Sequence, residues 1–347
     1  MKAIVKSKPA PGLDFLDVPE PTLRPGHVKV RVRYGSICGT DAHIYRWDPF
    51  AAERIKPPRI IGHEFSGIVE EVGEGVTNLK PGDPVASESH IVCGKCKQCL
   101  NGQAHVCVNT KILGVDVDGG FAPYVVIPEA NARKVPKSVP LEIACVQDPL
   151  GNAVHTVFAG PVEGQDILIT GMGPIGLFAL AVCKASCAKS VAVTEVSEYR
   201  LNIARKLGAD VILNPSYLTS KGTLEALQDA YPEGVDGVLE MSGHPDALDL
   251  AVSMVRPGGR ISLLGLYSSD FVNFRANDLI FKGVEIQCII GRRLWDTWDR
   301  MTQLLEGGKL NLEPIITHRF PYSNFIEAME LMIGGKAGKI VFTISEQ

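Results

Sequence analysis

Four cysteines stand close together in the sequence with the spacing C-x2-C-x2-C-x7-C. Thiolates at such spacing can surround one Zn²⁺ ion tetrahedrally and leave no coordination position open, which is typical of a structural site. An iron–sulfur cluster is the alternative, but the bacterial ferredoxin pattern has a shorter last interval followed by proline, and here Val108 follows. The spacing therefore favours structural zinc, held by Cys93, Cys96, Cys99 and Cys107.

A glycine pattern follows a strand predicted at residues 166–170 (DILIT), and an apolar helix is expected at 174–187. The pattern is Gly171-x-Gly173-x-x-Gly176. In this fingerprint the first glycine permits a tight turn, the second lets the backbone approach a pyrophosphate, and the third allows close packing of helix on strand. The helix N-terminus then faces the phosphates. The pattern alone is weak, but the strand and helix around it are the context that a dinucleotide site requires.

Glu195 closes the next predicted strand, at about the distance from the glycines where dinucleotide sites carry an acidic residue. A carboxylate there accepts from both hydroxyls of the adenosine ribose and repels a 2′-phosphate, so NAD is favoured over NADP. Arg200 follows one helical turn later. It is expected to stack on adenine or to support Glu195, and an ordinary surface charge is the alternative.

A second set of candidate metal ligands is dispersed: Cys38 in SICGTDAH, and His63 and Glu64 in IIGHEFSG. Each is weak alone, because a single buried cysteine or histidine is more often structural. Together, on a chain with a dinucleotide site, they can hold one Zn²⁺ while a fourth position stays open for a substrate hydroxyl. Zinc lowers the pKa of such a hydroxyl towards neutrality. This set therefore predicts a catalytic zinc site for alcohol oxidation.

The elements that position these residues change in character along the chain. Residues 1–150 consist of short expected strands between Pro and Gly turns, which predicts a twisted β-barrel or sandwich, with the zinc lobe at 88–110. Residues 151–291 alternate strands with helices, which predicts a doubly wound parallel sheet that binds ligands at the carboxyl ends of its strands. The six strands are expected at 166–170, 191–196, 211–214, 237–243, 260–266 and 284–290.

The tail, residues 292–347, carries an expected helix at 295–305 and a last strand at 339–344. Trp295 and Trp298 lie on that helix, and we expect them to pack in the core or at a subunit interface.

Composition narrows the function classes. The net charge is −4, so no basic excess exists for a nucleic-acid partner. No stretch approaches the roughly 18 apolar residues of a membrane span. The N-terminus lacks the apolar run of a signal peptide, so the cytoplasm is the expected compartment.

A longer pattern around the dispersed ligands identifies a family. Gly62-His63-Glu64-x2-Gly67-x5-Gly73-x2-Val76 resembles the signature of zinc-containing, medium-chain alcohol dehydrogenases. The four-cysteine lobe, KPGD at 80–83 and GMGPIG extend the resemblance to the whole chain. It implies an α/β protein with a GroES-like β-barrel catalytic domain, a Rossmann domain and a tail that returns to the catalytic domain. It also implies NAD, two zinc ions per chain, and a homotetramer.

Within this superfamily, several stretches resemble the L-threonine 3-dehydrogenases. The resemblance implies oxidation of L-threonine at C3 to L-2-amino-3-ketobutyrate, a step of amino-acid catabolism, with hydride passing to NAD. The stretches are SICGTDAHIYRWD (36–48), ESHIVCGKC (88–96), DPLGNAVHT (148–156), SEYRLNIARKLGA (197–209), GRRLWDTW (291–298) and LNLEPIITHRF (310–320).

The resemblance assigns roles around the catalytic zinc, which it places on the Cys38, His63 and Glu64 set. Thr40 and His43 form a relay that carries the alcohol proton to solvent. The alternative interpretation of His43 is an ordinary surface histidine. Asp148 lies near the metal, where many relatives carry Glu, and its shorter side chain leaves direct coordination open. We expect His90 to orient the polar groups of the substrate, with packing beside the lobe as the alternative. The implied NAD contacts are Ile175, Glu195, Arg200, Leu264, Gly265, Leu266, Ile289 and Ile290.

Three alternatives remain open at this point. A polyol or 2,3-butanediol dehydrogenase of the same superfamily would share the metal, relay and cofactor. A non-catalytic zinc-ribbon binding protein would need only the four cysteines and would usually be basic. A zinc-free NADPH quinone reductase is opposed by the cysteine lobe and by Glu195.

Overall fold

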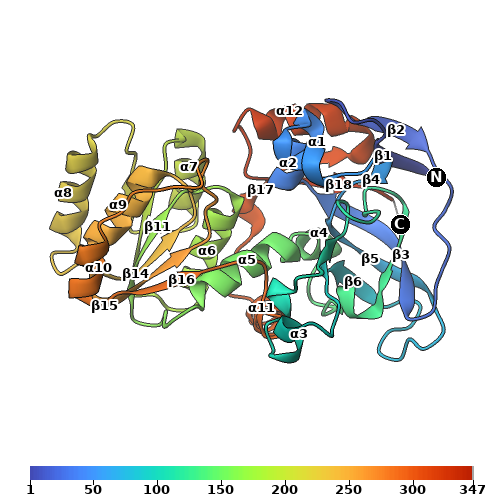
Figure 1. Ribbon diagram of the computed structural model, residues 1–347, viewed down its shortest axis with the longest axis horizontal. Coiled ribbons are helices and arrows are strands. Elements are labelled where there is room, and N and C mark those ends of the chain that lie inside the picture. The colour runs from blue at the N-terminus through green and yellow to red at the C-terminus, as the bar shows by residue number, and fades with distance from the viewer. Residues whose placement is uncertain (346–347) are drawn as a thin grey trace. The chain divides into compact units, whose positions relative to one another are not determined.

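The computed structural model describes residues 1–345 and divides into two compact units (Figure 1). The first unit comprises residues 1–149, 293–306 and 316–345, and the second comprises residues 150–292 and 307–315. Residues 307–315 thus belong to the second unit, although the sequence pattern groups them with the tail.

The first unit is built around a seven-stranded sheet in which β3 pairs with β5, β9 and β18. The alternating Val28, Val30 and Val32 of β3 are fully buried. Since successive side chains of a strand point to opposite faces, this alternation places one face of β3 in the core. The predicted β-rich architecture is confirmed. The strands are β3 (His27–Ser36), β5 (Glu64–Val72), β6 (Pro84–Ser87), β9 (Tyr124–Pro128), β10 (Ala132–Lys134), β17 (Ile316–Pro321) and β18 (Lys339–Thr343).

Smaller elements complete this unit. One short sheet joins β1 (Lys2–Lys6), β2 (Asp14–Asp17) and β4 (Arg59–Ile60), and another joins β7 (His90–Ile91) and β8 (Lys111–Ile112). The helices are α1 (Gly39–Arg46), α2 (Pro49–Arg54), α3 (Lys97–Leu100), α4 (Leu141–Ala144), α11 (Asp296–Glu306) and α12 (Phe325–Ile333). Short 3₁₀ turns are η1 (Ala104–Val106), η2 (Glu129–Asn131) and η4 (Tyr322–Asn324).

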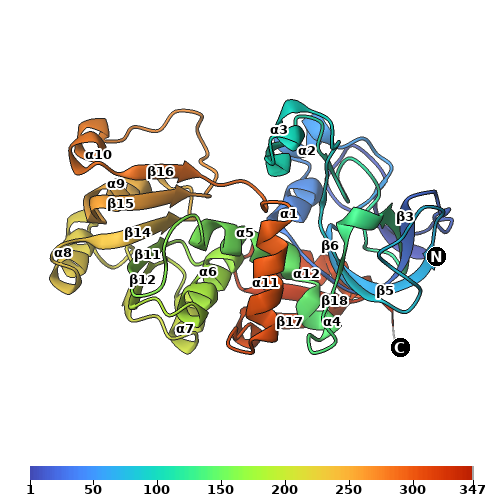
Figure 2. The same ribbon diagram turned by 90° about the horizontal axis from the view of Figure 1, so that it is seen from below.

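The C-terminal tail is part of the core of the first unit. Figure 2 shows α11, β17 and β18, in orange and red, among the blue and green elements of this unit. β18 pairs with β3 in antiparallel register, with Val341 opposite Ser36. This pairing brings the residues at the start of β18 to the end of β3, next to the chain that leads to Cys38.

The second unit is a six-stranded parallel sheet in the order β13-β12-β11-β14-β15-β16, which confirms the predicted doubly wound fold. Because each right-handed crossover returns on a side set by the strand order, α6 and α7 cover one face and α8, α9 and α10 the other (Figure 1). The strands are β11 (Asp166–Thr170), β12 (Ser190–Thr194), β13 (Val211–Leu213), β14 (Val235–Glu240), β15 (Val255–Leu263) and β16 (Glu285–Cys288).

Helices connect these strands. None of the helices in residues 1–345 is both long enough and apolar enough to cross a membrane. The helices of this unit are α6 (Pro174–Ala185), α7 (Glu198–Lys206), α8 (Ser220–Ala230), α9 (Pro245–Met254), α10 (Ala276–Lys282) and the turn η3 (Glu313–Ile315). α5 (Gln147–Val157) begins in the first unit and ends in the second.

Four strands end two or three residues earlier than their sequence predicts. The strands expected to reach residues 196, 243, 266 and 290 stop at residues 194, 240, 263 and 288. At the end of β14 the reason is visible, because the buried Glu240 carboxylate accepts hydrogen bonds from the amides of Ser242 (2.8 Å) and Gly243 (2.9 Å). Side-chain acceptors replace strand pairing there, and the chain turns away from the sheet.

Candidate active site

Cys38, His63 and Glu64 converge at one end of the large sheet. Cys38 is the N-cap residue of α1, two residues after β3 ends, while His63 directly precedes β5, the antiparallel partner of β3, and Glu64 begins it. One ligand atom from each of the three lies within 4.8 Å of the other two. The structure therefore brings together the sulfur, nitrogen and oxygen donors that a catalytic zinc site uses.

The buried atoms of this cluster fit a bound cation. His63 Nδ1 and Glu64 Oε1 are buried and have no hydrogen-bond partner among residues 1–345. Burial acts to lower the pKa of His63, but neighbouring acidic groups outweigh it and raise that pKa to about 10; they are Cys38, Asp41 and Glu64. Thiol, imidazole and carboxylate groups that lie together and include buried, unpartnered donor atoms fit a Zn²⁺ ion, which would bind their deprotonated forms.

Two residues that the sequence patterns did not single out complete the cluster. Lys339, at the start of β18, is 2% exposed, and its ammonium forms an ion pair with Glu64 Oε2 and donates to the Ile37 carbonyl (2.7 Å). Asp41 is fully buried, and its carboxylate accepts from the Cys38 amide (2.9 Å). Lys339 thereby binds one oxygen of Glu64, and the other oxygen, Oε1, is the one without a hydrogen-bond partner among residues 1–345. Asp41 could have been found from its place in the stretch SICGTDAH, three residues after Cys38, whereas no local pattern marks Lys339.

The predicted proton relay lies on α1 and just beyond it. The Thr40 hydroxyl lies 3.7 Å from the sulfur of Cys38. His43 follows one helical turn later, on the same face of α1, and half of its side chain is exposed. Its Nδ1 bonds to the carboxylate of Asp48, the N-cap of α2, which the sequence analysis did not identify. Thr40 is thus beside a metal ligand, and His43 is at the solvent boundary.

His90 lies in the zinc lobe and Asp148 contacts that lobe, and neither belongs to the three-residue cluster. Asp148 is buried in the first turn of α5, where its carboxylate accepts from the Ser89 amide (3.1 Å). The His90 amide donates to the carboxylate of the fully buried Glu88 (2.8 Å). Asn131 donates to the carbonyl of His90 (3.0 Å), so the backbone that carries the imidazole is held on both sides.

The four cysteines of the lobe form a compact group. The sulfur–sulfur distances are 3.5 Å for Cys96 to Cys99, 3.8 Å for Cys96 to Cys107, and 3.5 Å for Cys93 to Cys107. Zinc–sulfur bonds of about 2.3 Å at tetrahedral angles place the sulfurs about 3.8 Å apart. An amide hydrogen bond from Lys95 leads the effects that lower the pKa of Cys93 to about 6. The group therefore fits a closed, structural zinc site.

The glycines after β11 have three distinct surroundings. Gly171 has φ +86°, and a Cβ there would lie 2.9 Å from Ser242. A Cβ on Gly176 would lie 2.0 Å from the Gly171 carbonyl oxygen, so α6 packs against the turn only because the side chain is absent. Gly173, the N-cap of α6, has open space at its Cβ position. A phosphate can approach the backbone at that position, next to the helix N-terminus.

Glu195 lies one residue beyond β12 and is 8% exposed. Its carboxylate accepts from the amides of Met172 (2.8 Å), Val196 (2.9 Å) and Ser197 (3.0 Å). A carboxylate has about four lone-pair positions, so capacity remains for a ribose hydroxyl. Arg200 Nη1 lies 3.8 Å from Glu195 Oε2, and the buried Arg200 Nε has no hydrogen-bond partner among residues 1–345.

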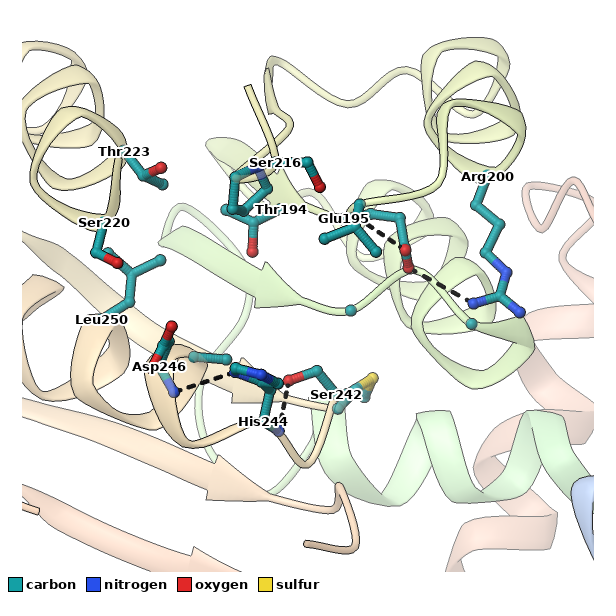
Figure 3. Close-up of a pocket in the computed structure, with 16 residues that line it drawn as sticks. Thr194, Glu195, Arg200, Ser216, Ser220, Thr223, Ser242, His244, Asp246 and Leu250 are labelled. Atoms are coloured by element: carbon teal, nitrogen blue, oxygen red, sulfur yellow. Dashed lines mark hydrogen bonds and ion pairs between the residues drawn. The ribbon is translucent and has the colours of Figure 1, made fainter. Parts of the chain in front are cut away.

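These residues line a pocket of about 520 Å³ at the carboxyl ends of the strands (Figure 3). That volume falls within the usual range of cofactor sites. Helices α8 and α9 and the turn after β14 supply a part of the lining that the sequence patterns did not reveal. The lining residues are Gly171, Gly173, Thr194, Glu195, Val196, Arg200, Pro215, Ser216, Ser220, Thr223, Met241, Ser242, His244, Asp246, Ala247 and Leu250.

The remaining NAD contacts that the sequence predicts also follow strand ends or begin a helix. Leu264, Gly265 and Leu266 come directly after β15, and Ile289 and Ile290 directly after β16. Ile175 is the second residue of α6. All of them are at the carboxyl edge of the sheet, but they do not line the pocket of Figure 3.

Comparison with protein families assigns both halves of the chain. Residues 24–137 match the alcohol dehydrogenase GroES-like domain, and residues 174–307 match the zinc-binding dehydrogenase domain. The chain belongs to the zinc-binding alcohol dehydrogenases that combine these two domains. The predicted fold, a GroES-like catalytic domain plus a Rossmann domain, is confirmed, and a non-catalytic zinc ribbon is excluded.

The relatives are similar along their whole length. The chain is 51% identical to the L-threonine 3-dehydrogenase of Pyrococcus abyssi, with 99% of each chain covered. It is 46% identical to the L-threonine 3-dehydrogenase of Bacillus licheniformis, with 98% of each chain covered.

Solved structures of more distant relatives share the fold. A short chain alcohol dehydrogenase from Escherichia coli CFT073, complexed with NADH, has a TM-score of 0.90 at 31% identity, with 99% of each chain covered. The 2R,3R-butanediol dehydrogenase of Bacillus subtilis also has a TM-score of 0.90, at 27% identity, with 99% of each chain covered.

Proposed function

We propose that the protein oxidises L-threonine at C3 to L-2-amino-3-ketobutyrate and passes the hydride to NAD, with a zinc ion held by Cys38, His63 and Glu64. The observation that carries the proposal is the convergence of these three donors within 4.8 Å, with His63 Nδ1 and Glu64 Oε1 buried and unpartnered among residues 1–345. Identities of 46–51% to L-threonine 3-dehydrogenases over nearly the whole chain support the choice of substrate.

A zinc ion at this site would act as a Lewis acid that lowers the pKa of the substrate hydroxyl. The protein must then remove the hydroxyl proton. Thr40 is the first acceptor, because its hydroxyl lies beside Cys38 and can both accept and donate a proton. His43 releases the proton to solvent from its half-exposed position, and Asp48 orients the imidazole through its bond to Nδ1.

Glu195 supports NAD as the hydride acceptor. Its carboxylate lies just beyond the end of β12 and lines the pocket, where it would accept from the adenosine ribose of a bound dinucleotide. A 2′-phosphate would place further negative charge against this carboxylate, so NADP is disfavoured. Gly173, with its open Cβ position, leaves room for the pyrophosphate.

The amino acid brings an ammonium and a carboxylate, and burying either without a partner is costly. We propose that the His90 imidazole helps to orient these groups. The hydrogen bonds of its amide to Glu88 and of its carbonyl from Asn131 fix the backbone from which the ring projects. A fixed backbone reduces the conformational freedom that substrate binding must restrict.

A polyol or 2,3-butanediol dehydrogenase is the alternative, because a 2R,3R-butanediol dehydrogenase shares the fold with a TM-score of 0.90. The identity to that enzyme, 27%, is much lower than the identity to L-threonine 3-dehydrogenases. A screen of NADH formation with L-threonine, L-serine, sorbitol, 2,3-butanediol and simple alcohols separates the two. We expect the highest kcat/KM for L-threonine, and a far higher value for sorbitol or 2,3-butanediol would overturn the substrate while leaving the zinc site in place.

We also propose that the chain works as a homotetramer in the cytoplasm, where reducing conditions keep the thiolate ligands free. The edge strand β16 and the preceding helix α10 expose large apolar side chains, among them Ile280 (72% exposed), Phe281 (89%) and Ile286 (40%), which supports self-association. Light scattering should give a tetramer for the natural protein and a smaller species for Phe281→Arg. Leu16→Arg, which changes an exposed residue of β2, is the control, and a monomeric natural protein would contradict the proposal.

A further inference from the structure

Thr223 carries a buried hydroxyl without a hydrogen-bond partner among residues 1–345. The residue is 2% exposed and lies in the first turn of α8. It lines the pocket of Figure 3, which is called the dinucleotide pocket below. A helical threonine commonly donates to a carbonyl of the preceding turn, but this one does not. In Figure 3 the Thr223 side chain extends from α8 on one side of the pocket. Because an unpartnered buried hydroxyl is unfavourable, its position indicates that a ligand supplies the partner.

The place of Thr223 in the pocket restricts which part of a dinucleotide it can meet. Figure 3 shows Thr223 and Ser220 on one side of the pocket, and Glu195 and Arg200 on the other. When the ribose lies at Glu195 and the phosphates lie near Gly173, the base extends from the ribose into the remaining space. That space is bordered by α8 and α9. Ala247 and Leu250, both on α9, offer apolar surfaces suited to a flat purine ring.

The geometry of adenine then selects one edge of the base. The ribose is attached at N9, and the 6-amino group lies at the opposite end of the purine. A residue across the pocket from the ribose site therefore meets the 6-amino edge. The amino group is a donor, and a threonine hydroxyl has lone pairs to accept from it.

We propose that Thr223 is a specificity-determining residue that reads the 6-amino edge of the adenine of NAD. The inference rests on the dinucleotide part of the proposed function and is independent of the substrate. It also explains why a hydroxyl is buried in the first turn of α8, where an apolar side chain would serve the core of the free protein better.

Binding of AMP and of purine riboside 5′-monophosphate, which lacks the 6-amino group, tests this proposal without any turnover. Titration calorimetry on the zinc-loaded protein should give a three- to tenfold tighter Kd for AMP, the range of about one hydrogen bond. Thr223→Val, which keeps the shape and removes the hydroxyl, should bind both nucleotides equally. Thr223→Ser should restore the preference for AMP.

Thr156→Val is the matched control. Thr156 is a fully buried threonine of the same unit, and its hydroxyl donates to the Asn152 carbonyl (2.7 Å). Loss of this hydrogen bond in Thr156→Val should lower the melting temperature and leave the preference for AMP unchanged. Thr223→Val should show the opposite pair of effects, because it removes an unpartnered hydroxyl: an unchanged or higher melting temperature, and a lost preference.

Two results would overturn this inference alone. One is a natural protein that binds the two nucleotides equally, and the other is Thr223→Val with the same preference as the natural protein. Absence of AMP binding altogether would overturn both this inference and the NAD assignment. A failure of L-threonine as a substrate leaves these binding measurements unaffected, so the two failures can be told apart.

Discussion

The indole Nε1 of Trp298 donates a hydrogen bond of 2.6 Å to Glu88 Oε2. Both side chains are buried, and the other oxygen of Glu88 accepts from the amide of His90. One carboxylate thus ties the tail helix α11 to the strand that carries a proposed substrate-orienting residue. The sequence led us to expect core or interface packing for both tryptophans, and Trp298 is a core residue with a specific polar partner.

This pairing predicts that Trp298→Phe destabilises the first unit. Hydrogen bonds to charged groups contribute about 1.5–3 kcal/mol, so the melting temperature should fall by several degrees. Trp295→Phe is the control, because Trp295 packs under the Arg133 guanidinium (4.4 Å to the ring centroid) and keeps an aromatic ring in the variant. Equal shifts for the two variants in scanning calorimetry would show that the Glu88 bond contributes nothing specific.

The two ligand sets predict two zinc ions per chain with different lability. A site with an open position exchanges its metal more readily than a closed one, so a chelator should remove the catalytic zinc first and abolish activity while the fold persists. Cys38→Ser should mimic that state, whereas Cys96→Ser should lose the lobe and lower the melting temperature. Cys183→Ser, at a buried site on α6, is the control. Mass-spectrometric metal analysis that finds iron, or one zinc after reconstitution with excess zinc, would refute this arrangement.

Glu195 predicts the choice between the two nicotinamide cofactors. Glu195→Ser removes the carboxylate that repels a 2′-phosphate and leaves Arg200 to attract one. The ratio of kcat/KM for NAD to that for NADP should fall at least about tenfold, and this ratio does not depend on how much protein is folded. Glu198→Ser, on the exposed first turn of α7, is the control. A natural enzyme that uses both cofactors equally well would show that Glu195 has been misassigned.

The role of His90 predicts a substrate-dependent loss. His90→Ala should reduce kcat/KM for L-threonine more than for 2-butanol, because only the amino acid brings charged groups that need a partner. His105→Ala is the control, since His105 is a half-buried histidine of the zinc lobe. An equal loss for both alcohols would leave His90 as scaffold only.

The parts of the fold that follow from local pattern could be predicted from the sequence. The alternating valines of β3 and the strand–glycine–helix pattern around Gly171 depend on neighbours in the chain, and the structure has both features. The ends of β12, β14, β15 and β16 could not be predicted, because an apolar residue still follows each within two positions: Val196, Met241, Leu264 and Ile289. The β14 end is fixed by the Glu240 carboxylate, which folds the following turn.

The residues of the candidate site also fall into two groups, those that the local sequence reveals and those that it does not. Cysteine spacing and the GHE motif belong to short stretches, so the candidate ligands could be named from the sequence. Lys339 and Thr223 could not, because the position of each depends on distant parts of the chain: that of Lys339 on the pairing of β18 with β3, and that of Thr223 on the packing of α8 beside the pocket for which we propose the dinucleotide. No local pattern distinguishes such residues from an ordinary surface lysine or helix threonine.

The most direct test of the proposed function follows the hydride itself. L-threonine deuterated at C3 is incubated with the zinc-loaded protein and NAD, and the reduced cofactor and the amino-acid product are examined by mass spectrometry. Transfer from C3 to NAD predicts that the reduced cofactor carries the deuterium and that 2-amino-3-ketobutyrate, or the aminoacetone formed from it, accumulates in equal amount. Unlabelled NADH, or no reduced cofactor from L-threonine while 2,3-butanediol is oxidised rapidly, would contradict the proposed reaction.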